Sequence, residues 1–318
     1  MIRTSFRPGK FDPGYLFGDS LIWQEISIQV PDEYVEPVSY LFSRYGHGLA
    51  MEPVGQGQVV LRTYLTTTSR QRLAHIEVGI NLINILEPVG ALTLTPLEEG
   101  ADWETAWKSH FTVLEVGSRL LVKPSWIEHT ASPEQVVIEL DPGMAFGTGY
   151  HPTTYGCMEA LERLVKPGMA VLDLGSGSGI LAITALKLGA AKAVAMDIDP
   201  QAIRAARQNF RRSGLQGRVS IAQSTLPHSL APAEEFDLVM ANISKRAICE
   251  RAPFIAQCLK SHGEDIGGVP GWFVASGFLN EQTAEVSETM SALGMDLVEE
   301  TPREDWTTLV FRAPYKRS

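Results

Sequence analysis

The stretch VLDLGSGSG at residues 171–179 decides the fold of this chain. A short apolar run typical of a buried strand leads directly into a glycine-rich turn, and residues 180–188 continue with the pattern of a helix. Glycines let the backbone turn sharply and let a ligand approach without interference from Cβ atoms. In open α/β sheets, ligands bind beyond the carboxyl ends of the strands, where this turn lies. The stretch therefore predicts a mostly parallel α/β sheet with a ligand site at this edge.

The glycine spacing narrows the choice of ligand without deciding it. The dinucleotide fingerprint G-x-G-x-x-G, started at Gly175, requires a glycine where the chain has Ile180. Started at Gly177, the fingerprint ends at Ala182, which its looser form accepts, so a nicotinamide dinucleotide stays possible. The whole turn reads Asp-x-Gly-x-Gly-x-Gly, which resembles the first motif of class I S-adenosylmethionine-dependent methyltransferases. We therefore expect all three glycines, the last being Gly179, to bind the cofactor.

The next strand supplies a carboxylate at its tip. Residues 193–197 form an apolar run that ends in Asp197. In nucleotide-binding folds an acidic residue at this place accepts hydrogen bonds from ribose hydroxyls, and one carboxylate can take two donors. We predict that Asp197 binds the cofactor's ribose. Asp199 and Pro200 have instead the pattern of an N-cap and of the first residue of the following helix.

The segment DPGMAFGTGYHPTT at residues 141–154 is rich in glycine, proline and threonine, which favours a shaped loop. Phe146 is suited to pack against an adenine or methionyl group of the ligand. The hydroxyls of Thr148 and Thr154 are expected to bind the ligand or the local backbone. His151 is a candidate base, but support of the loop is the favoured role because no partner carboxylate is evident from the sequence.

Asn242 follows another buried strand, at residues 236–241. Its side-chain oxygen can accept a hydrogen bond from an attacking amine and so aim the nitrogen lone pair at a methyl group. We therefore predict that Asn242 is the catalytic residue and also contacts the cofactor. Its alternative role is that of a strand-end amide whose hydrogen bonds are satisfied within the protein.

Two types of organisation are found along the chain. The first hundred residues predict the order strand, helix, strand, strand, helix, strand, which is the ferredoxin-like α+β plan. Short apolar runs then alternate with many helical patterns, which predicts a mostly parallel sheet covered on both faces. These later runs are residues 170–174, 193–197, 219–222, 236–241, 272–276, 296–299 and 307–311. Between the two parts, Trp103 and Trp107 fall on one face of a short helix.

Composition excludes several classes of protein. The 318 residues carry a net charge of −10, which disfavours direct binding to the phosphates of nucleic acids. Cys157, Cys249 and Cys258 have no C-x-x-C spacing, so neither a disulfide framework nor a metal site is expected. The chain shows neither a signal peptide nor an apolar run long enough for a membrane span. We therefore expect a cytoplasmic protein.

Three motifs together resemble one family, the ribosomal protein L-eleven methyltransferases (PrmA). They are residues 141–154, 173–179 and 239–243. The resemblance covers the chain well from about residue 100 onward. It implies a Rossmann-like catalytic domain with a seven-stranded sheet, S-adenosylmethionine as cofactor, and a ribosomal large-subunit protein as the methylated partner. It places Thr154, Gly175, Asp197 and Asn242 at cofactor-contacting positions. An arm at residues 1–22, Ser244-Lys245 and residues 262–270 depart from the family pattern.

The resulting expectation is a protein N-methyltransferase that modifies lysine side chains, the N-terminal amine, or both. Residues 1–22 are taken as an irregular arm, 23–98 as a substrate-recognition domain, 99–112 as a helical linker and 113–318 as the catalytic domain. A monomer without metal is expected. The alternatives are a methyltransferase for another protein or small-molecule amine, a non-catalytic S-adenosylmethionine-binding protein, and a nicotinamide-dependent dehydrogenase.

Overall fold

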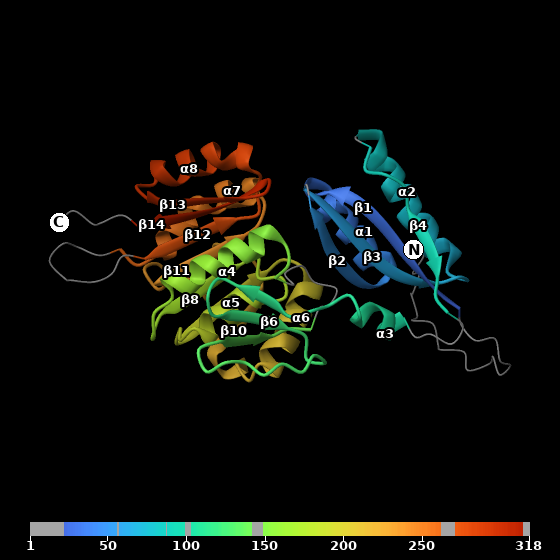
Figure 1. Cartoon of the computed structure of the whole chain (residues 1–318). Coiled ribbons are helices and arrows are strands. Elements are labelled where there is room, and N and C mark those ends of the chain that lie inside the picture. The colour runs from blue at the N-terminus through green and yellow to red at the C-terminus, as the bar shows by residue number, and fades with distance from the viewer. Residues whose placement is uncertain are drawn as a thin grey trace, which may run out of the picture.

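The chain folds into two α/β halves joined by a short helical segment (Figure 1). The computed structural model describes residues 22–55, 57–86, 88–98, 103–141, 149–261 and 271–313. The expected arm and the insertion at 262–270 lie outside these residues, apart from Ile22. No helix in the described part of the chain combines the length and apolar character that crossing a lipid bilayer requires.

The N-terminal half is an antiparallel sheet with two helices on one face. Its strands lie in the order β2-β3-β1-β4, which confirms the ferredoxin-like plan. Alternate side chains of β1, such as Ile26 and Ile28, are buried against α1 and α2, as the period-two pattern predicts. The elements are β1 (Trp23–Pro31), α1 (Val35–Tyr45), β2 (His47–Gly55), β3 (Gln58–Thr66), α2 (Arg70–Leu86) and β4 (Thr93–Pro96).

Helix α3 (Trp103–Lys108) joins the halves through aromatic side chains. The indole of Trp107 is buried, and its Nε1 donates a hydrogen bond to the carbonyl oxygen of Leu49 at 3.1 Å. The same ring lies 5.6 Å, between ring centroids, from Trp126 in the C-terminal half. The two tryptophans of α3 therefore pack into the structure. Asp102 directly precedes α3 in the sequence, where an aspartate is suited to cap a helix, but it lies outside the described residues.

A small sheet follows that the sequence patterns do not predict. Its strands are β5 (Leu114–Val116), β6 (Leu120–Lys123) and β7 (Val136–Glu139), and they pair in that order. Strands this short carry too few residues for a recognisable alternation.

The C-terminal half contains the expected large sheet. Its seven strands lie in the order β10-β9-β8-β11-β12-β14-β13, with the first five parallel and β14 antiparallel to both neighbours. All seven strand positions expected from the apolar runs are confirmed. The strands are β8 (Ala170–Leu174), β9 (Lys192–Asp197), β10 (Val219–Gln223), β11 (Leu238–Asn242), β12 (Trp272–Ser276), β13 (Asp296–Arg303) and β14 (Trp306–Arg312).

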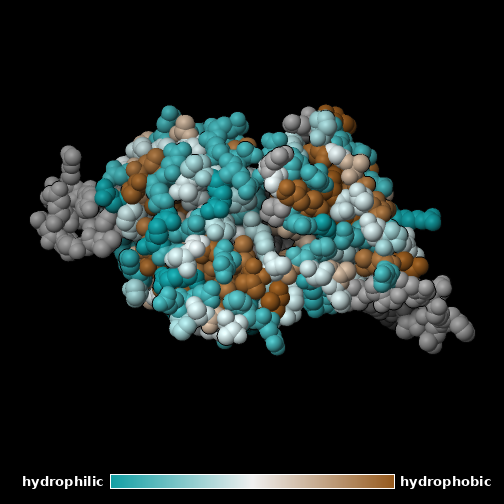
Figure 2. All heavy atoms as spheres, in the orientation of Figure 1, coloured by the Kyte–Doolittle hydropathy of each residue, from teal (hydrophilic) through white to brown (hydrophobic). Residues whose placement is uncertain are grey.

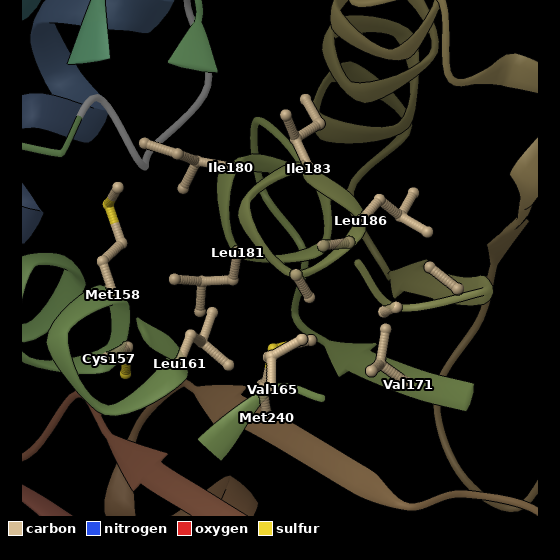
Figure 3. Packing of buried hydrophobic residues seen from close by; sticks show 14 of the residues in the cluster. Cys157, Met158, Leu161, Val165, Val171, Ile180, Leu181, Ile183, Leu186 and Met240 are labelled. Atoms are coloured by element: carbon tan, nitrogen blue, oxygen red, sulfur yellow. The ribbon is translucent and has the colours of Figure 1, made fainter. Parts of the chain in front are cut away.

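Helices cover both faces of this sheet, which buries central strands such as β8 and β11 and leaves the edge strands β10 and β13 more exposed. One face packs against α4 (Pro152–Leu164), α5 (Ile180–Lys187) and α6 (Pro200–Arg212), and the other against α7 (Lys245–Cys258) and α8 (Thr283–Ala292). Figure 3 shows Leu161 and Leu181, from α4 and α5, packed near Val171 and Met240 of the sheet. This packing holds β8 rigidly, so the turn that follows it has a defined position.

Candidate active site

A cavity of about 620 Å³ lies between the two halves. Its floor is the carboxyl edge of the large sheet, with Gly175, Gly177, Asp197 and Asn242 among its lining residues. Four of the residues predicted to bind the cofactor are therefore brought to one cavity. Its volume is in the range typical of sites for small molecules and cofactors.

The glycine turn forms the centre of this floor. The backbone N–H groups of Gly175 and Ser176 both donate to the carbonyl oxygen of Met196, which fastens the turn to β9. Gly175 has a φ of +75°, and a Cβ built there would lie 2.1 Å from Cγ2 of Ile243. Gly179 plays a different part, because it begins α5 and packs against the ring of Phe210.

Asp173 lies beneath the turn and is completely buried. Its Oδ2 accepts a hydrogen bond from the backbone N–H of Ala182 at 3.0 Å, while Oδ1 has no partner among the described residues. Burial raises the pKa of this carboxyl group to about 7, and the negative charge of Asp197 adds to the rise. Asp173 therefore ties the start of α5 to the strand that precedes the turn.

Asp197 connects the tip of β9 to the glycine turn. Its Oδ2 accepts a hydrogen bond from the N–H of Gly177 at 2.8 Å, and its Oδ1 accepts from the N–H of Asp199 at 2.9 Å. Each carboxylate oxygen has a second lone pair, so the group can still accept ligand hydroxyls. Asp199 caps α6 by accepting from the N–H of Gln201, as its sequence position predicts.

Asn242 is the last residue of β11, and only one of its two side-chain polar atoms has a hydrogen-bond partner among the described residues. Its Nδ2 donates to Oγ1 of the buried Thr154 at 3.2 Å, which sets the orientation of the amide. Its Oδ1 is buried and has no hydrogen-bond partner among the described residues. A buried acceptor without a donor is costly, so this oxygen is suited to a donor on a ligand. Thr154 thus lies behind Asn242 and orients it.

The loop at 141–154 is described only at its ends. Phe146 and Thr148, both predicted to bind the cofactor, lie outside the described residues. At one end, Oδ1 of Asp141 accepts from the N–H of Ser125 at 2.7 Å. At the other end, His151 caps α4 by accepting from the N–H of Thr153.

The environment of His151 favours the role of loop support over that of a base. Burial lowers the pKa of its imidazole to about 4, so the ring is neutral near pH 7. Its Nδ1 also lies 2.7 Å from Oγ1 of Thr153. A base with so low a pKa has little affinity for the proton of an amine.

Sequence reasoning missed the part of the cavity that comes from distant segments. Tyr40 and Arg44 of α1 line it from the N-terminal half, and Trp306 lines it from β14. The Nε1 of Trp306 is buried without a partner among the described residues, so it can donate to a ligand. Only the buried face of α1 has a pattern in the sequence, because the residues of its other face are polar as on any surface helix.

The donor set suits a nucleoside cofactor that carries an amino-acid tail. The glycine turn leaves room for a close approach, Asp197 offers acceptors for ribose hydroxyls, and the indole of Trp306 offers a buried donor. In the described part of the chain, no cluster of three or more histidine, cysteine or acidic residues could hold a metal ion.

Comparison with known proteins identifies the family. The family model described as "Ribosomal protein L11 methyltransferase (PrmA)" matches residues 22–314. The chain belongs to this family. Its cofactor is S-adenosylmethionine, and the fold is that of the class I methyltransferases, as the motifs predict.

Individual relatives support the assignment over nearly the whole chain. A ribosomal protein L11 methyltransferase of Chloroflexus aurantiacus is 38% identical and covers 92% of this chain and 98% of its own length. One of Bacillus cytotoxicus is 33% identical, with 91% and 98% covered. The crystal structure of a ribosomal protein L11 methylase from Lactobacillus delbrueckii subsp. bulgaricus superimposes with a TM-score of 0.57 at 28% identity. It covers 64% of this chain and 100% of its own.

Proposed function

We propose that this enzyme transfers methyl groups to amines of the large-subunit ribosomal protein L11. The targets are lysine side chains, the N-terminal amine, or both. The names of the relatives support the protein substrate. The observation that carries the chemistry is the free Oδ1 of Asn242, a buried acceptor in a cavity that adjoins the cofactor-binding turn.

Asn242 has the geometry to orient an amine. Because its Nδ2 is engaged by Thr154, its Oδ1 is the atom left to accept a hydrogen bond from the attacking nitrogen. That bond holds one N–H of the amine and directs the lone pair away from it. Bound S-adenosylmethionine supplies a methyl group on a positively charged sulfur. Orientation of the two reactants can lower the barrier by several kcal/mol.

The proton of the amine is the main energetic obstacle. A free lysine has a pKa near 10.4, so making it neutral at pH 7 costs roughly 4.6 kcal/mol. Desolvation and a nearby positive charge both lower the pKa of a lysine amine. The walls of the cavity can supply the desolvation, and we infer that the amine loses its proton to water before it reacts.

The roles of the segments follow from this proposal. We assign recognition of the protein substrate to residues 23–98, linkage to 99–112 and catalysis to 113–318. The position of α1 along the cavity supports the first assignment, because it places the N-terminal half beside the reacting groups. We further propose that the enzyme acts as a monomer in the cytoplasm, where ribosomal proteins are available, without direct binding to nucleic acid.

The test uses purified enzyme, S-adenosylmethionine and ribosomal protein L11, with intact-mass detection of added methyl groups. Asn242→Ala is expected to lower the methylation rate by about a hundredfold, in line with the loss of one oriented hydrogen bond at a reacting group. Its cofactor affinity, measured by calorimetry, should fall by a smaller factor than the methylation rate does. Thr154→Val should give a smaller loss of rate, because it removes only the hydroxyl that orients the amide.

The outcomes separate the alternatives. Cofactor binding without methylation of L11 by the wild-type protein would contradict L11 as the substrate and would leave two alternatives, another amine as substrate or a non-catalytic S-adenosylmethionine-binding protein. An unchanged rate for Asn242→Ala at saturating cofactor would contradict the role of Asn242.

A further inference from the structure

We propose that the groove between α1 and α2 binds an apolar segment of the substrate protein, next to the segment whose amine enters the cavity. The inference rests on the proposed protein substrate and adds to it a second contact site. It concerns the outer surface of the helices, away from the cofactor-binding turn.

The groove is formed by a close approach of the two helices. It has a volume of about 550 Å³ and is lined by Pro37, Tyr40, Leu41, Gly79 and Ile83. A Cβ built on Gly79 would lie 2.5 Å from Cδ1 of Leu41, so a larger residue there would require the Leu41 side chain to move. The lining is almost entirely apolar, although it faces the solvent.

Beside the groove, α2 exposes a stripe of apolar side chains. Val78, Leu82 and Ile85 are 58%, 59% and 77% exposed, and they are spaced one helical turn apart. Residues 78–85 include no charged side chain. Figure 2 shows brown, apolar residues gathered over this part of the N-terminal half. Contiguous apolar surface of this kind is uncommon on a protein without a partner and marks an interaction site.

Tyr40 connects this surface to the active site. Its side chain lines both the groove and the catalytic cavity. Its hydroxyl accepts a hydrogen bond from Nη1 of Arg44 at 2.7 Å, and Arg44 also lines the cavity. A polypeptide that reaches Asn242 past α1 is therefore adjacent to the groove. This continuity favours the substrate protein as its occupant.

A second copy of this chain is the competing occupant. Each copy carries a net charge of −10, so two copies repel each other, whereas a partner protein of basic composition is attracted. The substrate protein is therefore the occupant we propose.

The test is a steady-state analysis of L11 methylation by charged variants of the exposed stripe. Leu82→Glu and Leu82→Lys should both raise the KM for intact L11 by about tenfold, because each places a charge where an apolar contact forms. Their kcat and their affinity for S-adenosylmethionine should stay at wild-type values. Because the two substituents have opposite charges, a purely electrostatic effect would move KM in opposite directions.

Val298→Glu is the matched control. Val298 is 52% exposed on β13, at the edge of the large sheet. This variant should keep the wild-type KM. Ile85→Glu provides an independent second variant of the stripe, and thermal unfolding verifies that each protein is folded.

Three results would overturn the inference while L11 methylation by the wild type stands. The first is a KM for the Leu82 variants equal to that of Val298→Glu. The second is opposite shifts of KM for the two charges. The third is sedimentation that shows a wild-type dimer and a monomeric Leu82→Glu, which would make the stripe a self-association surface. Absence of L11 methylation by the wild type would instead contradict the proposed function.

Discussion

The two halves of the molecule differ in where they leave buried polar atoms without partners. In the C-terminal half, such atoms occur at several places, and three of them lie at or near the carboxyl ends of neighbouring strands: Oδ1 of Asp173, Oγ of Ser176 and Oδ1 of Asn242. In the N-terminal half, the corresponding atom is Oδ2 of Asp32, beside the other half. Of these atoms, Oδ1 of Asn242 belongs to a residue that lines the cavity, whereas Asp32 marks a contact between the halves.

This difference shows how the two sheets are used. Parallel strands bring their carboxyl ends to one edge, so loops from several strands can converge on one ligand. In an antiparallel sheet, successive strands end at opposite edges, so their loops do not converge on one ligand. Such a sheet and its helices can instead contact other parts of a protein or a partner through their surfaces. The comparison predicts that changes at the strand ends of the large sheet affect the cofactor, while changes in the small sheet or at its contacts affect stability and substrate use.

The largest expected effect is that of Gly175→Ala. The added Cβ would collide with Ile243 in a backbone conformation that disfavours alanine, so the turn must move. We expect cofactor affinity to fall by about a hundredfold or more, which corresponds to roughly 2.7 kcal/mol. Gly214→Ala is the matched control, because Gly214 has a similar φ of +68° with nothing within 4 Å of the built Cβ. If both variants bind the cofactor equally well, the turn is not part of its site.

Asp197→Ala tests the next strand end. The variant loses the acceptor for the predicted ribose contact and also releases the N–H of Gly177. Cofactor binding should weaken by roughly 1.5–3 kcal/mol. Isothermal titration with S-adenosylmethionine measures the change. Equal affinities for the variant and the wild type would contradict the ribose role and would leave Asp197 with a structural role only.

Trp107→Phe tests the link between the halves. The substitution keeps an aromatic ring in the cluster but removes the hydrogen bond to the carbonyl oxygen of Leu49. We expect a loss of about 1 kcal/mol in the free energy of unfolding. Cofactor affinity should stay unchanged, since Leu49 borders the cavity on the side of the N-terminal half. Chemical denaturation and cofactor titration on the same preparation would measure the two effects separately. A large loss of cofactor affinity would contradict the expectation that contacts of the N-terminal half affect stability and substrate use but not the cofactor.

The smallest expected effect is a pH dependence at Asp32. Burial, the neighbouring carboxyl group of Glu304 and the charge of Asp305 together raise the pKa of this carboxyl group from 3.8 to about 6. Both acidic neighbours lie in the β13–β14 turn of the other half. A raised pKa means that the protonated group is stabilising below about pH 4, and that this contribution is lost as pH rises through about 6.

Asp32→Asn removes the ionisation while keeping the shape. Its melting temperature should exceed that of the wild type above pH 6, and the difference should shrink as pH falls from about 6 to about 4. Asp296→Asn is the control, because Asp296 forms an exposed ion pair with Arg312. A difference between Asp32→Asn and wild type that does not vary over this range would contradict the raised pKa.

The sequence by itself determined the fold of each half and, through the resemblance of three motifs to one family, the cofactor. The information lay in local patterns, each contained within a short segment of the chain. They are the alternation of apolar and polar residues at 25–30, the glycine turn after residue 174 and the apolar runs of the large sheet. Asp197 and Asn242 could be identified because a buried strand ends at each of them. Neighbouring residues impose these patterns, so they are readable without knowledge of the rest of the chain.

Only the tertiary structure decided which distant residues share the cavity. Tyr40 and Asn242 are some 200 positions apart and come from different halves, yet both line it. The free Oδ1 of Asn242 likewise depends on Thr154, which lies on another element and engages the opposite end of the amide. Contacts of this kind arise from packing between elements, and packing leaves no periodic signal in either segment that takes part.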